Sequence, residues 1–185
     1  MKMLKQKLLI GLILLFGCKI YGQSDIPQFD THHKNIYVEF LGSHLLAGVN
    51  FDMRLNKGRM DGIGFRAGIG GLSATGFSQN TEITLGLVTF PLEFNHLVGK
   101  KRSSFVTGVG LLPIYATFSA TGQLTDYEFV RGEGFSLVGG FLTMGYRFQP
   151  KKTGVMFQFN WNPLILRGSG FNIGWFGLGI GLGFK

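Results

Sequence analysis

Eight polar side chains recur at alternate positions in segments whose other residues are mostly apolar or glycine. Alternate residues of a strand point to the same face of its sheet, so these side chains would share one face. Carboxylates and guanidinium groups gathered there are suited to ion pairing, or to passing a proton or small ion from one group to the next. The eight residues are Glu39, Asp52, Arg54, Arg66, Glu93, Arg147, Gln158 and Asn160.

A closed sheet of eight strands has an interior only wide enough for side chains. Charges buried in such a lumen must be paired. We therefore expect the eight residues to form a polar network that plugs the lumen, in which Arg66 pairs with a carboxylate. The candidate partners are Glu39, Asp52 and Glu93. The alternative role for the same residues is a narrow path for ions or protons.

The segments that carry these residues alternate as membrane strands do. Residues 176–184 alternate bulky apolar residues with glycine. A soluble sheet, including that of a soluble ligand-binding barrel, would instead place polar side chains on its second face. Eight segments have this character and about the length that a tilted strand needs to cross a membrane. They are residues 35–42, 45–55, 61–71, 82–96, 103–115, 134–148, 153–162 and 172–184.

The fourth segment has an irregular pattern. Its apolar residues lie at odd positions up to Leu87 and at even positions from Phe90 onward. A β-bulge near Val88 would restore one apolar face, and Pro91 supports it because proline cannot donate a hydrogen bond to a neighbouring strand.

The connections between the segments are of two kinds. Residues 56–59, 99–102 and 149–152 are short and basic, whereas residues 72–81, 116–133 and 163–171 are longer. This asymmetry is typical of an outer-membrane barrel with short turns in the periplasm and long loops outside the cell. The longest loop, residues 116–133, is a candidate partner-binding segment. The alternative is a mobile surface loop without a specific partner. The candidate contact residues are Asp126, Tyr127, Glu128, Phe129 and Arg131.

The first 22 residues have the pattern of a secretory signal peptide, with basic Lys2, Lys5 and Lys7 before an apolar run. We expect cleavage after Gly22, a flexible periplasmic tail over residues 23–34 and a barrel over residues 35–185. The single cysteine, Cys18, lies in the leader. It is either removed with the leader or lipidated.

Composition excludes a nucleic-acid-binding role. The net charge is +8, but four lysines belong to the leader, and without them 14 basic residues face 10 acidic ones, which leaves +4. That charge is too small to indicate nucleic acid. Charged residues make up 15% of the chain, against about 25% in ordinary soluble domains.

No catalytic, cofactor-binding or metal-binding residues are predicted. A hydroxyl nucleophile needs a base within hydrogen-bond reach, and His44 is the single histidine expected on the side of the long loops. The neighbours His32 and His33 would point apart on an extended chain, with no further ligand at a suitable spacing.

From Asn35 onward the chain resembles the small eight-stranded outer-membrane β-barrel proteins of Gram-negative bacteria. The resemblance rests on the leader, the alternation, the asymmetric connections and the aromatic Phe184 near the end. It implies an all-β, eight-stranded, antiparallel up-and-down transmembrane β-barrel in the outer membrane. Outer-membrane lipid and lipopolysaccharide are then its surroundings.

The resemblance does not select one function, because such barrels act as anchors, adhesins, lipid-modifying enzymes and complex subunits. We expect a non-enzymatic structural, anchoring or complex-subunit role, with envelope proteins as partners. The alternatives are a narrow pore for small or hydrophobic solutes and an enzyme that modifies lipid A.

Overall fold

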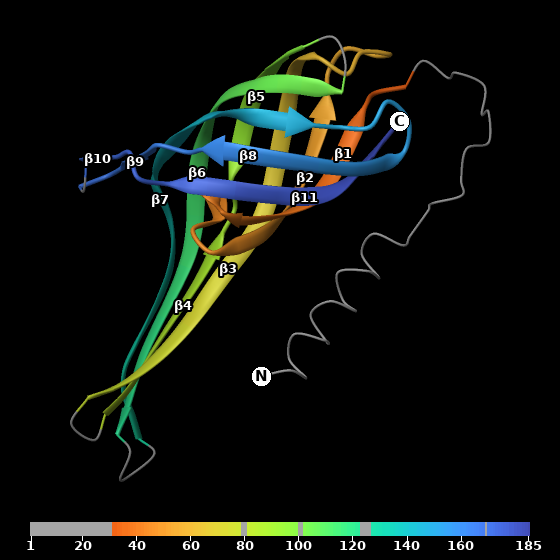
Figure 1. Ribbon diagram of the computed structural model, residues 1–185. Coiled ribbons are helices and arrows are strands. Elements are labelled where there is room, and N and C mark those ends of the chain that lie inside the picture. Colours follow the sequence, from red (N-terminus) through yellow and green to blue (C-terminus); the bar gives the residue numbers. More distant parts are fainter. Residues whose placement is uncertain (1–30, 79–80, 100–101, 123–126, 169) are drawn as a thin grey trace, which may run out of the picture.

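The computed structural model describes residues 31–78, 81–99, 102–122, 127–168 and 170–185 (Figure 1). The described chain is all-β, as expected, apart from one short helical turn, η1 (Gly42–His44). No helix in it is both long and apolar enough to cross a membrane. The strands are β1 (Lys34–Leu41), β2 (Ala47–Arg54), β3 (Gly62–Ser78), β4 (Thr81–Thr89), β5 (Leu92–Val98), β6 (Ser103–Gly122), β7 (Tyr127–Phe148), β8 (Gly154–Trp161), β9 (Leu164–Leu166), β10 (Gly170–Asn172) and β11 (Phe176–Phe184).

The antiparallel pairings close into a ring. Starting at β1, the ring runs through β2, β3, β5, β6, β7, β8 and β11, which pairs with β1 again. β4 and β5 occupy the same place in the strand order, one beyond the other, because both pair with β3 on one side and with β6 on the other. The pairing of the last strand, β11, with the first, β1, that an up-and-down barrel requires is therefore present.

The two ends of the ring differ. The ends of β2 and β3, of β5 and β6, and of β7 and β8 that are joined by short connections lie at one end, which we call the turn end. The opposite end, which carries η1 and the β9–β10 hairpin, is the loop end. The expected signal peptide, and residues 23–30 of the expected tail, lie outside the described residues. The last residues of that tail are attached to the turn end, since the backbone N–H groups of Arg54 and Gly58 donate to the carbonyls of His33 (2.9 Å) and Thr31 (3.0 Å).

Bulky apolar side chains cover the outside of the ring. On β11 the outward residues Leu178, Ile180 and Leu182 are exposed, while the glycines between them face inward. Those glycines leave room for larger neighbours: a Cβ added at Gly179 would lie 3.0 Å from the Tyr37 ring. The apolar residues of β11 therefore form part of the outer surface. The glycines between them leave space inside the ring for side chains from other strands.

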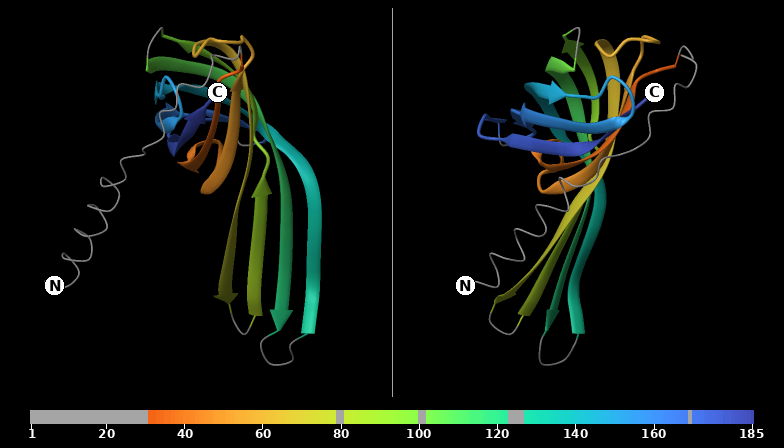
Figure 2. Two further views of the ribbon diagram at one scale, coloured as in Figure 1. Left: turned by 90° about the vertical axis from the view of Figure 1, so that its right-hand side faces the viewer. Right: turned by 45° about the vertical axis from the view of Figure 1, so that its right-hand side comes forward.

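Four strands continue past the loop end as a projecting sheet, shown below the ring in Figure 2. It consists of residues 71–78 of β3, 81–89 of β4, 113–122 of β6 and 127–138 of β7. The expectation that residues 72–81 and 116–133 are loops was therefore wrong for residues 72–78, 116–122 and 127–133, which belong to strands. Serine, threonine and glycine in these segments obscured an alternation that continues, as in the cross-strand pair of Thr75 and Thr84.

The β-bulge expected near Val88 is absent. The register from β4 continues unchanged into β5, because Thr89 pairs with Gly70 and Leu92 pairs with Ala67, three residues further on each strand. The apolar residues change face because the surroundings of the two faces change where the sheet leaves the ring. Pro91 only interrupts the ladder, and its carbonyl still accepts the N–H of Gly68 (2.9 Å).

A charge on the outside of the ring should destabilise the protein much more than a charge on the projecting sheet. We expect Ile180→Arg, in the middle of β11, to lower the free energy of unfolding in lipid vesicles by about 2 to 4 kcal/mol. Leu85→Arg, at a similarly exposed position of the projecting sheet, should change it by less than about 0.5 kcal/mol. Urea unfolding followed by tryptophan fluorescence measures both, and equal losses would show that lipid does not contact the ring.

Candidate functional site

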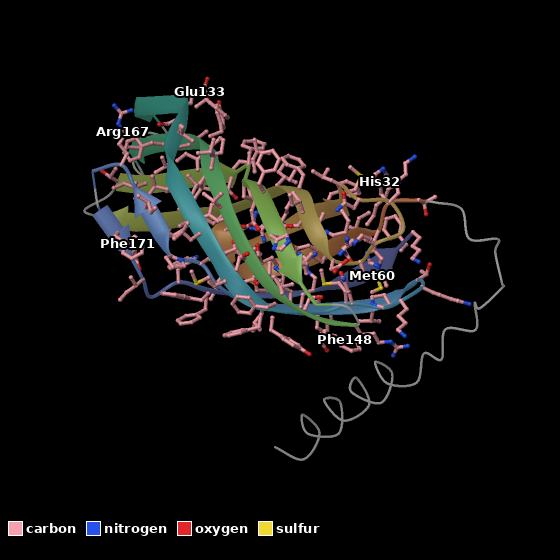
Figure 3. The ribbon with its side chains drawn as sticks, turned by 90° about the horizontal axis from the view of Figure 1, so that it is seen from above. His32, Met60, Glu133, Phe148, Arg167 and Phe171 are labelled. Carbon is pink, nitrogen blue, oxygen red and sulfur yellow. The ribbon has the colours of Figure 1, made fainter. Side chains whose placement is uncertain are left out.

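All eight polar residues expected to share one face lie inside the ring, and none is more than 3% exposed. They come from β1, β2, β3, β5, β7 and β8. The guanidinium groups of Arg54, Arg66 and Arg147 equal in number the carboxylates of Glu39, Asp52 and Glu93. The side chains crowd the interior between the turn end, near His32 and Met60, and the loop end, near Arg167 and Phe171 (Figure 3).

Asp52 is the centre of the half of the network nearer the turn end. Its carboxylate accepts hydrogen bonds from Nη2 of Arg54 (2.8 Å), Nη1 of Arg147 (2.8 Å) and Nδ2 of Asn95 (2.9 Å). Arg147 also donates from Nε to the side-chain oxygen of Gln158. One carboxylate thus joins two guanidinium groups from opposite sides of the ring.

Arg66 is the centre of the half nearer the loop end. Its guanidinium contacts Oε2 of Glu93 at 2.5 Å and Oε1 of Glu39 at 3.4 Å. Two of the three expected partners of Arg66 are therefore present, and Asp52, the third, pairs with other arginines instead. The amides of Asn50 and Asn160 each donate to Glu39 at 3.3 Å.

Aromatic rings contact the arginines of both halves. The hydroxyl of Tyr37 accepts a hydrogen bond from Arg66 (3.1 Å), and Arg147 lies 5.9 Å from the centre of the same ring. Arg66 also lies 5.5 Å from the centre of the Phe141 ring. Such contacts between cations and aromatic faces are favourable where water is excluded.

An apolar cluster closes the loop end. Leu112, Phe141 and Leu164 are at most 2% exposed, and Trp175 packs against them. These residues come from β6, β7, β9 and the segment before β11, so no single segment of the sequence indicated the cluster. The interior is therefore polar in its middle and apolar towards the loop end.

His44 is a further interior residue, which the sequence analysis placed only on the side of the long loops. It is fully buried, and its Nε2 lies 3.9 Å from Oε2 of Glu39. A Cβ added at Gly48, Gly68 or Gly70 would collide with the imidazole. These three inward glycines are the signal that a large side chain from elsewhere fills the space beside them.

The turn end is closed by polar groups. His33 is buried, and its Nε2 lies 3.2 Å from the carbonyl of Pro150. Burial lowers the pKa of His33. Gln149 donates to the carbonyl of Met60 at 2.7 Å. In the neighbouring turn, a hydrogen bond from Arg59 lowers the pKa of Asp61.

The candidate partner-binding residues remain a prediction. Asp126 lies outside the described residues. The backbones of Tyr127, Glu128, Phe129 and Arg131 belong to β7, but their side chains are not described. Within the described part of the chain, no group of three or more histidine, cysteine, aspartate or glutamate residues is arranged to hold a metal ion.

Comparison with known proteins identifies the fold. No protein-family model matches the chain, and no curated protein matches it. Among solved structures it is similar to Ail, the attachment invasion locus protein of Yersinia pestis, which was crystallised with the heparin analogue sucrose octasulfate. The match has a TM-score of 0.51 and 10% identity, and it covers 83% of this chain and 99% of Ail. The chain has the fold of a small outer-membrane β-barrel. This fold and the apolar outer surface of the barrel indicate the outer membrane as its location.

The barrel should depend on complete pairing inside its lumen. Arg66→Met removes the cation between Glu39 and Glu93 and should lower the free energy of unfolding by about 3 to 5 kcal/mol. Adding Glu93→Gln to the same variant should recover part of that loss, because one uncompensated carboxylate is removed. The exposed ion pair at the turn end supplies the control, since Arg59→Met should lose less than about 1 kcal/mol. Equal losses for Arg66→Met and Arg59→Met in urea unfolding would contradict a closed network.

Proposed function

We propose that this protein is a non-enzymatic outer-membrane barrel that holds the projecting sheet outside the cell and does not conduct solutes. One observation carries this proposal: three arginines and three carboxylates, all buried, fill the lumen. Because eight strands leave an interior only wide enough for side chains, this network leaves no continuous space for a solute. The apolar cluster above it adds a second barrier.

The short connections at the turn end support an orientation with that end in the periplasm. The projecting sheet then lies outside the membrane. Its two faces differ in a way that supports a role in a larger envelope assembly. The face that continues the inside of the barrel carries Leu72, Leu85, Leu87, Ile114 and Phe118. The other face combines serine and threonine side chains, such as Thr75, Thr84 and Thr117, with the exposed aromatic residues Phe77 and Phe135.

The inner face of the projecting sheet also has open space. A Cβ added at Gly76, Gly132 or Gly134 would meet no atom within 4 Å. An apolar face of this kind outside the membrane is typical of a surface that contacts a partner protein. The barrel would then act as the membrane anchor of that contact surface.

The enzyme alternative has little support from the geometry. Ser43 and His44 are both fully buried, and the Ser43 hydroxyl donates to Oε2 of Glu39 at 2.9 Å. A lipid substrate would have no access to them. We expect the lipid A of cells to be unchanged in mass when the gene is deleted, and a lost modification would favour the enzyme.

We do not propose that this protein binds the ligand of the Ail crystal. Sucrose octasulfate is polyanionic, and binding it would require a cluster of cations. Among the residues whose side chains are described, the loop end and projecting sheet carry Arg167 together with the acidic Glu82 and Glu133. This balance of charge does not favour a sulfated sugar.

Planar-bilayer recording tests the closed lumen. The wild-type barrel should give no discrete conductance steps, because its interior is occupied. The variant Arg66→Ser with Phe141→Ala, which removes two side chains that contact each other inside the barrel, should give such steps. A shift of electrophoretic migration on heating shows that each sample is folded. Wild-type steps as large as those of the variant would support the narrow-pore alternative.

Site-specific cross-linking in cells tests the contact surface. A photoreactive residue at Leu85, on the apolar face of β4, should form an adduct with a protein partner. The same residue at Thr84, on the opposite face of the same strand, should form little or none. Equal yields at the two positions, or no adduct at either, would contradict a partner-binding role for the apolar face.

A further inference from the structure

Basic side chains are concentrated at the turn end of the barrel. Of the seven that the structure describes there, all but the half-buried Lys34 are exposed. One acidic side chain, that of Asp61, accompanies them in the described part of this end, and it pairs with Arg59 at 2.9 Å. The seven residues are Lys34, Lys57, Arg59, Arg102, Lys151, Lys152 and Lys185.

The cations surround the barrel instead of forming one patch. They lie in the connections between β2 and β3, between β5 and β6 and between β7 and β8, and at the junction where Lys34 and the C-terminal Lys185 meet. These are alternate junctions around the ring of eight strand positions. We call the seven residues the basic ring. In the sequence, Lys100 and Lys101 directly precede Arg102.

The charge of the molecule is therefore polarised along the barrel axis. The three arginines and three carboxylates of the lumen cancel. The described side chains of the loop end and projecting sheet include two carboxylates, Glu82 and Glu133, and one cation, Arg167. The excess positive charge therefore lies at the turn end.

The basic ring lies next to the residues that face lipid. Exposed Leu55 precedes Lys57 by two residues, exposed Phe105 follows Arg102 by three, and exposed Val155 follows Lys152 by three. Lysine and arginine side chains just beyond an apolar belt can extend along it and present their charges at the level of the lipid head groups.

We propose that the basic ring binds the phosphates of anionic phospholipids in the inner, periplasmic leaflet of the outer membrane. The inference rests on the orientation given under the proposed function. A ring around the whole circumference matches a leaflet, which also surrounds the barrel, better than it matches one compact partner. Attraction of this kind acts within about 10 Å at 0.1 M salt and weakens as salt is added.

Lipid selectivity in reconstituted membranes tests the proposal. The probes are spin-labelled phosphatidylglycerol and phosphatidylcholine in phosphatidylethanolamine bilayers that contain the full barrel. The wild type should hold phosphatidylglycerol in its lipid shell at least about three-fold more strongly than phosphatidylcholine, and 0.5 M salt should reduce this ratio. The variant Lys57→Gln, Arg102→Gln, Lys151→Gln, which removes three of the seven basic groups, should lower this ratio. Arg167→Gln, at the other end, should leave it unchanged.

Each outcome decides the proposal. A ratio near one for the wild type, or an unchanged ratio in the triple variant, would overturn it. So would a loss in Arg167→Gln as large as that in the triple variant. If the triple variant instead loses co-sedimentation with purified peptidoglycan while its lipid ratio is unchanged, the ligand is an anionic wall polymer. Heat-modified migration and conductance of the same samples test the proposed function separately, since a folded, closed barrel without lipid selectivity contradicts this inference alone.

Discussion

Neutralisation of charge inside a narrow closed sheet is the constraint on which the rest of the structure depends. Eight strands can close only if the space between them is filled, and here long polar side chains fill it. Isolated buried charges would be very unfavourable, so Asp52 joins Arg54 and Arg147 while Arg66 joins Glu39 and Glu93. The glycines that line the interior follow from the same requirement. Only a strand without inward side chains leaves room for the Tyr37 and His44 rings.

A second constraint is that four strands pass through two different surroundings. Beside lipid their outer residues are apolar, and most of their inner residues are polar or glycine, with apolar Leu112 and Phe141 near the loop end. Past the loop end the pattern reverses in β4, where Leu85 and Leu87 lie on the inner face while Thr84 lies on the outer one. The register does not change at this boundary. The reversal from β5 to β4 therefore reflects a change of surroundings and not a change of register, and it leaves an apolar face outside the membrane.

The sequence predicted the parts of the fold that follow from local alternation. Membrane strands, their antiparallel order and the closure of the last strand on the first could be inferred because period-two patterns such as residues 176–184 are local. The pairing of Arg66 was also within reach, since few carboxylates share its face. The projecting sheet was missed because serine, threonine and glycine resemble loop composition. The apolar cluster and the burial of His44 were missed because they bring together residues from distant strands.

We propose a barrel whose interior is structural and whose contacts lie at its outer surfaces. Hydrogen exchange at the arginine side chains tests most directly whether the lumen network excludes a continuous path of water. In lipid nanodiscs, NMR can follow the guanidinium protons of Arg66 and Arg147 beside those of Arg59, which is exposed at the turn end. We predict that exchange at Arg66 and Arg147 is slower by orders of magnitude than at Arg59. Equally fast exchange at all three would contradict the closed lumen.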